Sequence, residues 1–147
     1  MTRRLYLHVG MPKTGTTYVQ SVLHAGAERL AEQGLTLLPR TRRGSFRLSS
    51  AVRGDGDRGP VDRFAERLRE VATPRVLTSD ELLGAASPDQ IADLLTACGD
   101  AEVHVVVSVR SLSRLLPSTW QQRVQQRGES PPLEEFLAAV TSREGDV

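Results

Sequence analysis

Cysteine and lysine are almost absent from this chain of 147 residues, and long apolar runs are absent altogether. With Cys98 as the one cysteine, no internal disulfide can form, and a cysteine-based metal cluster is excluded. No stretch approaches the roughly 20 consecutive apolar residues of a membrane span, and the short apolar run near Met1 does not have the form of a signal peptide. The sequence therefore predicts a cytoplasmic protein without a membrane span.

Strong charge of one sign is also lacking. Nineteen basic and 18 acidic residues leave a net charge of +1, which gives no general attraction to nucleic acid. The length favours one domain covering residues 1–147, and the apolar and charged fractions of 39% and 25% are ordinary for a globular chain.

The scarcity of lysine draws attention to residues 5–20, LYLHVGMPKTGTTYVQ, because Lys13 is the one lysine of the chain. The stretch predicts an apolar strand, a turn containing glycine and proline, and then a helix that one of three threonines could cap (Thr14, Thr16, Thr17). Such a turn directs backbone N–H groups and the positive end of the helix dipole at one point, which suits phosphate or sulfate. A lysine, unlike an arginine, adds a compact charge that fits a narrow loop.

The loop is not a Walker A motif, because Thr16 stands where the lysine of Gly-Lys-Ser/Thr should be and Lys13 lies inside the loop. Instead, Gly-x-Pro-Lys-x-Gly-Thr-Thr resembles the 5′-phosphosulfate loop of sulfotransferases that use 3′-phosphoadenosine-5′-phosphosulfate (PAPS), the bacterial, carbohydrate-type branch in particular. The resemblance implies that Lys13 contacts the bridging and terminal donor oxygens and that the loop amides and threonine hydroxyls hold the 5′-phosphate. The segment that would supply them is Lys13, Thr14, Gly15, Thr16 and Thr17.

Strands and helices are expected to alternate along the chain. The expected strands cover residues 5–9, 35–38, 75–79 and 102–109, and the expected helices cover residues 16–33, 61–72, 88–97, 112–127 and a last piece from 133. The valine run at 102–109 is typical of a strand buried on both faces of a parallel sheet. The predicted fold is α/β, three layers with a central parallel sheet, and the resemblance implies a P-loop-like sulfotransferase core.

Three polar segments follow strands directly and should meet at the carboxyl edge of the sheet. They are the loop around Lys13, the turn Ser79-Asp80-Glu81, and Arg110. Four arginines between residues 40 and 47 could also grip an anionic acceptor at the mouth of this site. The favoured alternative is that residues 40–47 form an ordinary solvated loop.

Arg110 ends the valine strand, and Ser118 follows eight residues later. This spacing resembles the 3′-phosphate site of PAPS sulfotransferases, where the arginine offers a bidentate fork and the serine a neutral donor. The alternative is an arginine at a strand end and an unrelated helical serine. Pro117 would either start a new helix at Ser118 or redirect that hydroxyl.

A base must take the proton of the sulfuryl acceptor. None of the three histidines (His8, His24, His104) follows a strand directly, so the base is expected to be Glu81 or, second, Asp80. Either carboxylate could instead cap the next short helix.

The resemblance implies in-line sulfuryl transfer from PAPS to a hydroxyl or amine without a metal, with Lys13 and Glu81 as catalytic residues and Arg110 with Ser118 selecting the 3′-phosphate. It implies an acceptor that could be a carbohydrate and is not identified by the sequence. Family members usually exceed 200 residues, so an oligomer or a partner chain could complete the site. Two alternatives stay open: a non-catalytic nucleotide-binding or interaction protein, and a P-loop kinase.

Overall fold

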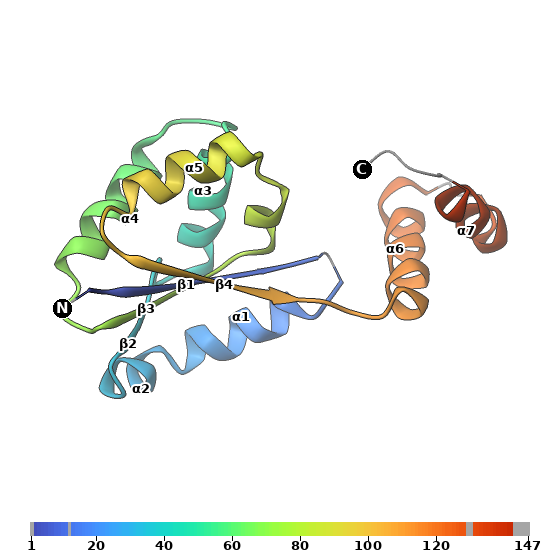
Figure 1. Cartoon of the computed structure of the whole chain (residues 1–147). Coiled ribbons are helices and arrows are strands. Elements are labelled where there is room, and N and C mark those ends of the chain that lie inside the picture. Colours follow the sequence, from blue (N-terminus) through green and yellow to red (C-terminus); the bar gives the residue numbers. More distant parts are fainter. Residues whose placement is uncertain (1, 12, 129–130, 143–147) are drawn as a thin grey trace.

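The computed structural model describes residues 2–11, 13–128 and 131–142. Four parallel strands form one sheet in the order β2-β3-β1-β4, with helices on both faces (Figure 1). The strands are β1 (Arg4–Gly10), β2 (Leu35–Leu37), β3 (Arg75–Ser79) and β4 (Glu102–Ser108). The predicted three-layer α/β/α architecture with a parallel sheet is confirmed.

Helices α1 and α2 lie on one face of the sheet, and α3, α4 and α5 lie on the other (Figure 1). Helices α6 and α7 lie beyond the carboxyl end of β4. The helices are α1 (Thr16–Ala25), α2 (Ala27–Glu32), α3 (Arg42–Val52), α4 (Gly59–Glu70), the short 3₁₀ helix η1 (Glu81–Ala85), α5 (Pro88–Ala97), α6 (Leu112–Arg127) and α7 (Leu133–Thr141). In the part of the chain that the structure describes, no helix is long and apolar enough to cross a membrane.

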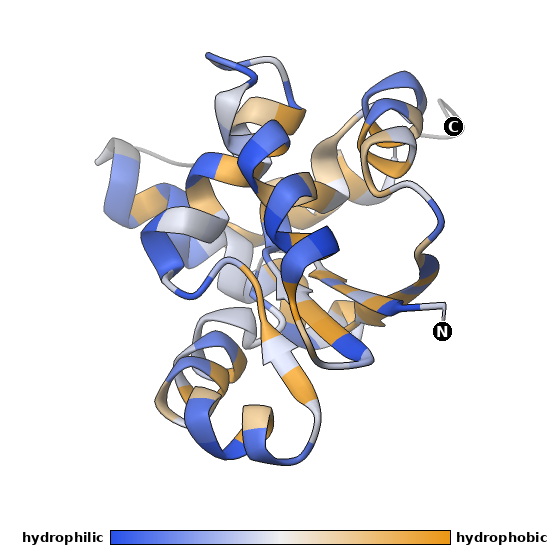
Figure 2. Cartoon of the chain, turned by 90° about the vertical axis from the view of Figure 1, so that its left-hand side faces the viewer, coloured by the Kyte–Doolittle hydropathy of each residue, from blue (hydrophilic) through white to orange (hydrophobic). Residues whose placement is uncertain are grey.

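The core lies between the central strands and the helices α3, α4 and α5. Figure 2 shows apolar residues along the strands and hydrophilic residues on the outer helical surfaces. The side chains that are almost wholly excluded from solvent include Leu5 on β1, Val76 on β3, Leu48 on α3, Leu68 on α4 and Leu94 on α5. These helices therefore hold one face of β1 and β3, the two strands in the middle of the sheet, in a fixed position.

The valine strand β4 is not buried on both faces, so that expectation is wrong. It is one of the two edge strands and, among the described residues, pairs with β1 alone. The core covers its start, where Val103 is partly buried. Val105, Val106 and Val107 are 62%, 45% and 57% exposed. An apolar run predicts burial only for a strand that is covered on both edges and both faces, and β4 has a strand neighbour on one edge alone within the described residues.

Three further expectations are corrected along the chain. Residues 42–52 form helix α3 rather than a loop, because the Thr41 hydroxyl accepts a hydrogen bond from the Gly44 amide (3.1 Å) and caps it. Gly26 separates α1 from α2, so the first expected helix is two helices. Pro117 lies inside a continuous α6 and starts no new helix at Ser118.

Candidate anion site at the carboxyl edge of the sheet

The turn from β1 into α1 depends on a close approach at Gly10. A Cβ atom there would lie 2.6 Å from Thr16 Cγ2 and 2.9 Å from Thr14 Oγ1. Lys13 has a φ of 69°, the one positive φ of a non-glycine residue in the described chain. This conformation is energetically unfavourable, and residues that adopt it are concentrated in ligand-binding turns. The turn is therefore a compact backbone loop that a larger residue at position 10 would open.

Gly15, with a φ of 89°, is the N-cap of α1, and no side chain caps this helix. The expectation that a threonine hydroxyl caps α1 is therefore wrong. The Thr14 hydroxyl donates to the Met11 carbonyl (2.7 Å) instead and braces the loop. The Tyr18 amide donates to the Gly15 carbonyl (3.0 Å). Because no side chain caps α1, the amides of Thr16 and Thr17 and the positive dipole end stay available to an anion.

The loop opens into a depression of about 370 Å³, which we call the anion pocket. It is lined by Lys13, Gly15, Thr16, Thr17, Glu81, Arg110 and Gln122. The guanidinium of Arg110 donates from Nη1 to the Lys13 carbonyl over 3.0 Å, across 97 residues of sequence. The three polar segments expected to meet at the carboxyl edge thus do meet there.

Two predicted residues lie outside the lining. Thr14 is turned to the Met11 carbonyl, and Ser118 does not line the anion pocket. Gln122 on α6 does line it, although the sequence reasoning missed it. The signal that could have found Gln122 is its position one helical turn after Ser118, on the same face of α6.

Beneath the loop, His8 joins the carboxyl ends of three strands. Its Nδ1 lies 2.7 Å from Ser79 Oγ on β3, and its Nε2 lies 2.7 Å from Ser108 Oγ on β4. A hydroxyl can donate or accept, so both ring nitrogens of the neutral imidazole are satisfied in either tautomer. Burial lowers the pKa of His8, and nearby Glu81 only partly opposes this. The sequence reasoning set His8 aside, since cross-strand partners are invisible without the register.

The two acidic candidates have different surroundings. Asp80 is buried and accepts from the Leu82 amide at the start of η1 (2.9 Å), so it takes the capping role weighed above. Burial raises the pKa of Asp80. Glu81 is half-buried, lines the anion pocket, and accepts from Gln20 Nε2 on α1 (2.8 Å). The structure thus separates a structural carboxyl group from one that reaches the pocket.

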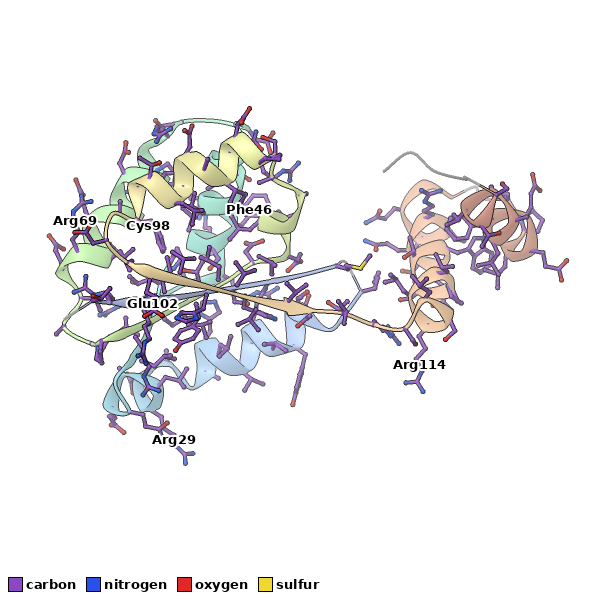
Figure 3. The ribbon with its side chains drawn as sticks, viewed as in Figure 1. Arg29, Phe46, Arg69, Cys98, Glu102 and Arg114 are labelled. Carbon is purple, nitrogen blue, oxygen red and sulfur yellow. The ribbon has the colours of Figure 1, made fainter. Side chains whose placement is uncertain are left out.

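Other reactive groups lie elsewhere. Cys98, at the end of α5, is buried in the core (Figure 3), and burial raises its pKa to about 11. In the described ranges, no group of three or more histidine, cysteine, aspartate or glutamate side chains is placed to hold a metal ion.

Comparison of the chain with models of known protein families, with curated proteins and with solved structures found no match.

Proposed function

We propose that the protein is a PAPS-dependent sulfotransferase that transfers a sulfuryl group to a hydroxyl or amine acceptor, within a P-loop-like core. The observation that carries the proposal is the hydrogen bond from Arg110 to the Lys13 carbonyl. It joins the two segments that separately resemble the 5′-phosphosulfate loop and the 3′-phosphate site. A nucleotide with phosphates at both positions would use both segments at once. The cytoplasmic location expected from the sequence stays a prediction.

The chemistry of the anion pocket fits such a donor. One ammonium group, one guanidinium group and two threonine hydroxyls line it, beside the positive end of α1. A Cβ atom at position 10 would collide with Thr16. Glycine at this position therefore keeps the turn compact and lets the loop backbone lie close to a ligand. When bound, PAPS supplies an activated sulfuryl group and a phosphate leaving group.

Lys13 stabilises the negative charge that develops on the departing phosphate oxygen, and Thr16 and Thr17 hold the 5′-phosphate by hydroxyl and amide donors. Arg110 still has guanidinium donors beyond the one given to Lys13, and these select the 3′-phosphate. The role assigned to Ser118 by the resemblance passes to Gln122, which lines the pocket. Positioning and electrostatics supply most of the rate.

Glu81 is the base in this proposal. Its carboxylate accepts the proton of the acceptor hydroxyl while the oxygen–sulfur bond forms and the sulfur–phosphate-oxygen bond breaks. The Gln20 amide holds Glu81 by one carboxylate oxygen, so the other oxygen is available to the acceptor. Asp80 is less suited, because it is buried and already bonded to the Leu82 amide.

The proposal is tested by calorimetric titration with 3′-phosphoadenosine-5′-phosphate, against ATP and adenosine 5′-phosphate, without magnesium. Only the ligand with both phosphates should bind tightly. Binding should be lost in Lys13→Ala and weakened about tenfold or more in Arg110→Ala. Arg114→Ala is the matched control, because Arg114 is exposed on α6 and lines no part of the pocket (Figure 3).

Preference for ATP with magnesium would overturn the proposal in favour of a kinase. Tight binding that survives Lys13→Ala would show that the loop is not the site. Binding without transfer to any acceptor in a screen would reduce the proposal to nucleotide binding, and loss of transfer in Glu81→Gln with unchanged ligand binding would identify the base.

A further inference from the structure

A second depression adjoins the anion pocket and shares one wall with it. It has a volume of about 540 Å³, and we call it the acceptor pocket. Its lining includes Gln20 from α1, Arg42, Arg43 and Phe46 from α3, and Asp80 and Glu81 after β3. Glu81 lines both depressions, so a group held in the acceptor pocket would meet the proposed base and the anion pocket at the same carboxylate.

We propose that the acceptor pocket binds an anionic molecule whose reacting hydroxyl is carried on a ring. The inference rests on the proposed function, because it assigns a substrate class to the same site. It is drawn from two arginines on α3, an exposed aromatic ring beside them, and the acidic residues that follow β3 in the same lining.

The cationic wall is made by Arg42 and Arg43, adjacent residues in the first turn of α3. Both are exposed, and neither guanidinium group has a hydrogen bond or ion pair with the other described residues. No acidic residue stands in that turn, although the positive end of a helix dipole normally favours one. Two guanidinium groups at a positive helix end repel each other, and a bound carboxylate or sulfate would relieve that repulsion through charge-assisted hydrogen bonds.

The apolar part of the lining is Phe46 and Leu82. Phe46 (labelled in Figure 3) follows the two arginines by one turn of α3. Its side chain is 57% exposed, whereas the other two phenylalanines, Phe64 and Phe136, are each 3% exposed in cores. An exposed phenyl ring inside a depression offers its face to a sugar or aromatic ring. Phe46 therefore supplies the surface that a ring-bearing acceptor would pack on.

Opposite charges line the pocket from two different elements, and this polarity orients the ligand. Asp80 and Glu81 follow β3, with Glu81 held by Gln20 over 2.8 Å, and the two arginines belong to α3. A ligand anion is repelled from Glu81 and attracted to Arg42 and Arg43, so the ligand's opposite side, with its hydroxyl, faces the base. A neutral acceptor of the same shape would lack this preference for one orientation.

The test uses two matched ligand pairs on the full chain: methyl β-D-glucuronide against methyl β-D-glucoside, and 4-hydroxyphenylacetate against tyrosol. Dissociation constants are measured with and without saturating 3′-phosphoadenosine-5′-phosphate. In at least one pair the anionic member should bind about tenfold more tightly at low salt, and the difference should shrink as salt rises. The pair that shows the difference identifies the ring as a sugar or an aromatic one.

Variants then connect the preference to the pocket. Arg42→Gln/Arg43→Gln should abolish the anionic preference, and Arg47→Gln should keep it, because Arg47 is an exposed residue of α3 outside the lining. Phe46→Ala should weaken both members of the pair and leave their ratio unchanged. Circular dichroism of each variant verifies that α3 is intact.

Equal binding of both members in both pairs, or a preference that survives the double substitution, would overturn the proposal. If 3′-phosphoadenosine-5′-phosphate binds and no member of either pair binds, the acceptor pocket is wrong and the donor site stands. If that nucleotide does not bind but the anionic preference is present and depends on Arg42 and Arg43, the pocket stands and the sulfotransferase proposal fails.

Discussion

Gly10→Ala is the most direct perturbation of the turn on which the site depends. The added Cβ would meet Thr16 Cγ2 at 2.6 Å, Thr14 Oγ1 at 2.9 Å and Ser108 Cβ at 3.3 Å. Real Cβ atoms do not approach other atoms to 2.6 Å, so β1, β4 or the start of α1 must shift. Overpacking of this kind costs about 1–3 kcal/mol of unfolding free energy. Loss of chain entropy in the unfolded state opposes it by roughly 0.4–1 kcal/mol.

The free energy of unfolding is measured by urea denaturation, with Gly56→Ala as the control. A Cβ on Gly56 meets nothing within 4 Å, and its φ is not positive, so this variant isolates the entropic gain. Gly10→Ala/Thr16→Ser removes the nearest methyl group and should recover part of the lost stability while keeping the Thr16 hydroxyl. If Gly10→Ala is as stable as Gly56→Ala, or if removing the methyl changes nothing, the close approach of β1 to α1 is wrong.

Two other predictions concern capping and titration. Ser87→Ala removes the cap of α5, where the hydroxyl accepts from the Gln90 amide in a capping box, so unfolding in urea should show a loss of about 1 kcal/mol. Ser111→Ala should cost little, since Ser111 at the start of α6 makes no capping bond, and equal losses would contradict the cap assignment. The pKa of Asp80 is raised above 3.8 in the fold, so the folded state holds this proton more tightly than the unfolded chain. The stability of the protein relative to Asp80→Asn should therefore fall as pH rises from 3.8 through the folded pKa, and then level off. Urea titrations that show the opposite slope would contradict a pKa of Asp80 raised by burial.

The sequence predicted most of the fold because its elements have strong local signals. The Ser87-Pro88 start of α5 and the apolar spacing of α4 are recognisable without any tertiary information. The wrong predictions concern features that depend on tertiary structure. The valines of β4 carry the same pattern whether the strand is central or at an edge, and only the strand order decides which. The charge run at 42–47 is typical of a solvated loop, and the one local signal for a helix there is the capping hydroxyl of Thr41.

The sequence predicted those residues of the candidate site that directly follow a strand. Lys13, Glu81 and Arg110 were chosen because the carboxyl ends of parallel strands meet at one edge, and they do line one depression. Ser118 and Gln122 show the limit of that rule, since both lie on one face of α6 and only Gln122, one turn further along the helix, lines the depression. His8 shows another limit, because its serine partners come from strands 71 and 100 residues away.

The edge position of β4 has a consequence for the site itself. Arg110 follows a strand whose outer edge lacks a neighbour among the described residues. The carboxyl half of β4 is held by four links: the ladder to β1, the His8–Ser108 contact, the hydrogen bond from the Met11 amide to the Ser108 carbonyl, and the bond from Arg110 to Lys13. Two of these links end on β1 and two on the loop that follows it. The Arg110 guanidinium is thus positioned relative to the Lys13 loop directly, rather than through the α3–α5 core. A shift of β4 would move Arg110 away from the loop without unfolding the protein. The affinity of the anion pocket for a ligand should therefore be more sensitive than global stability to changes at this edge.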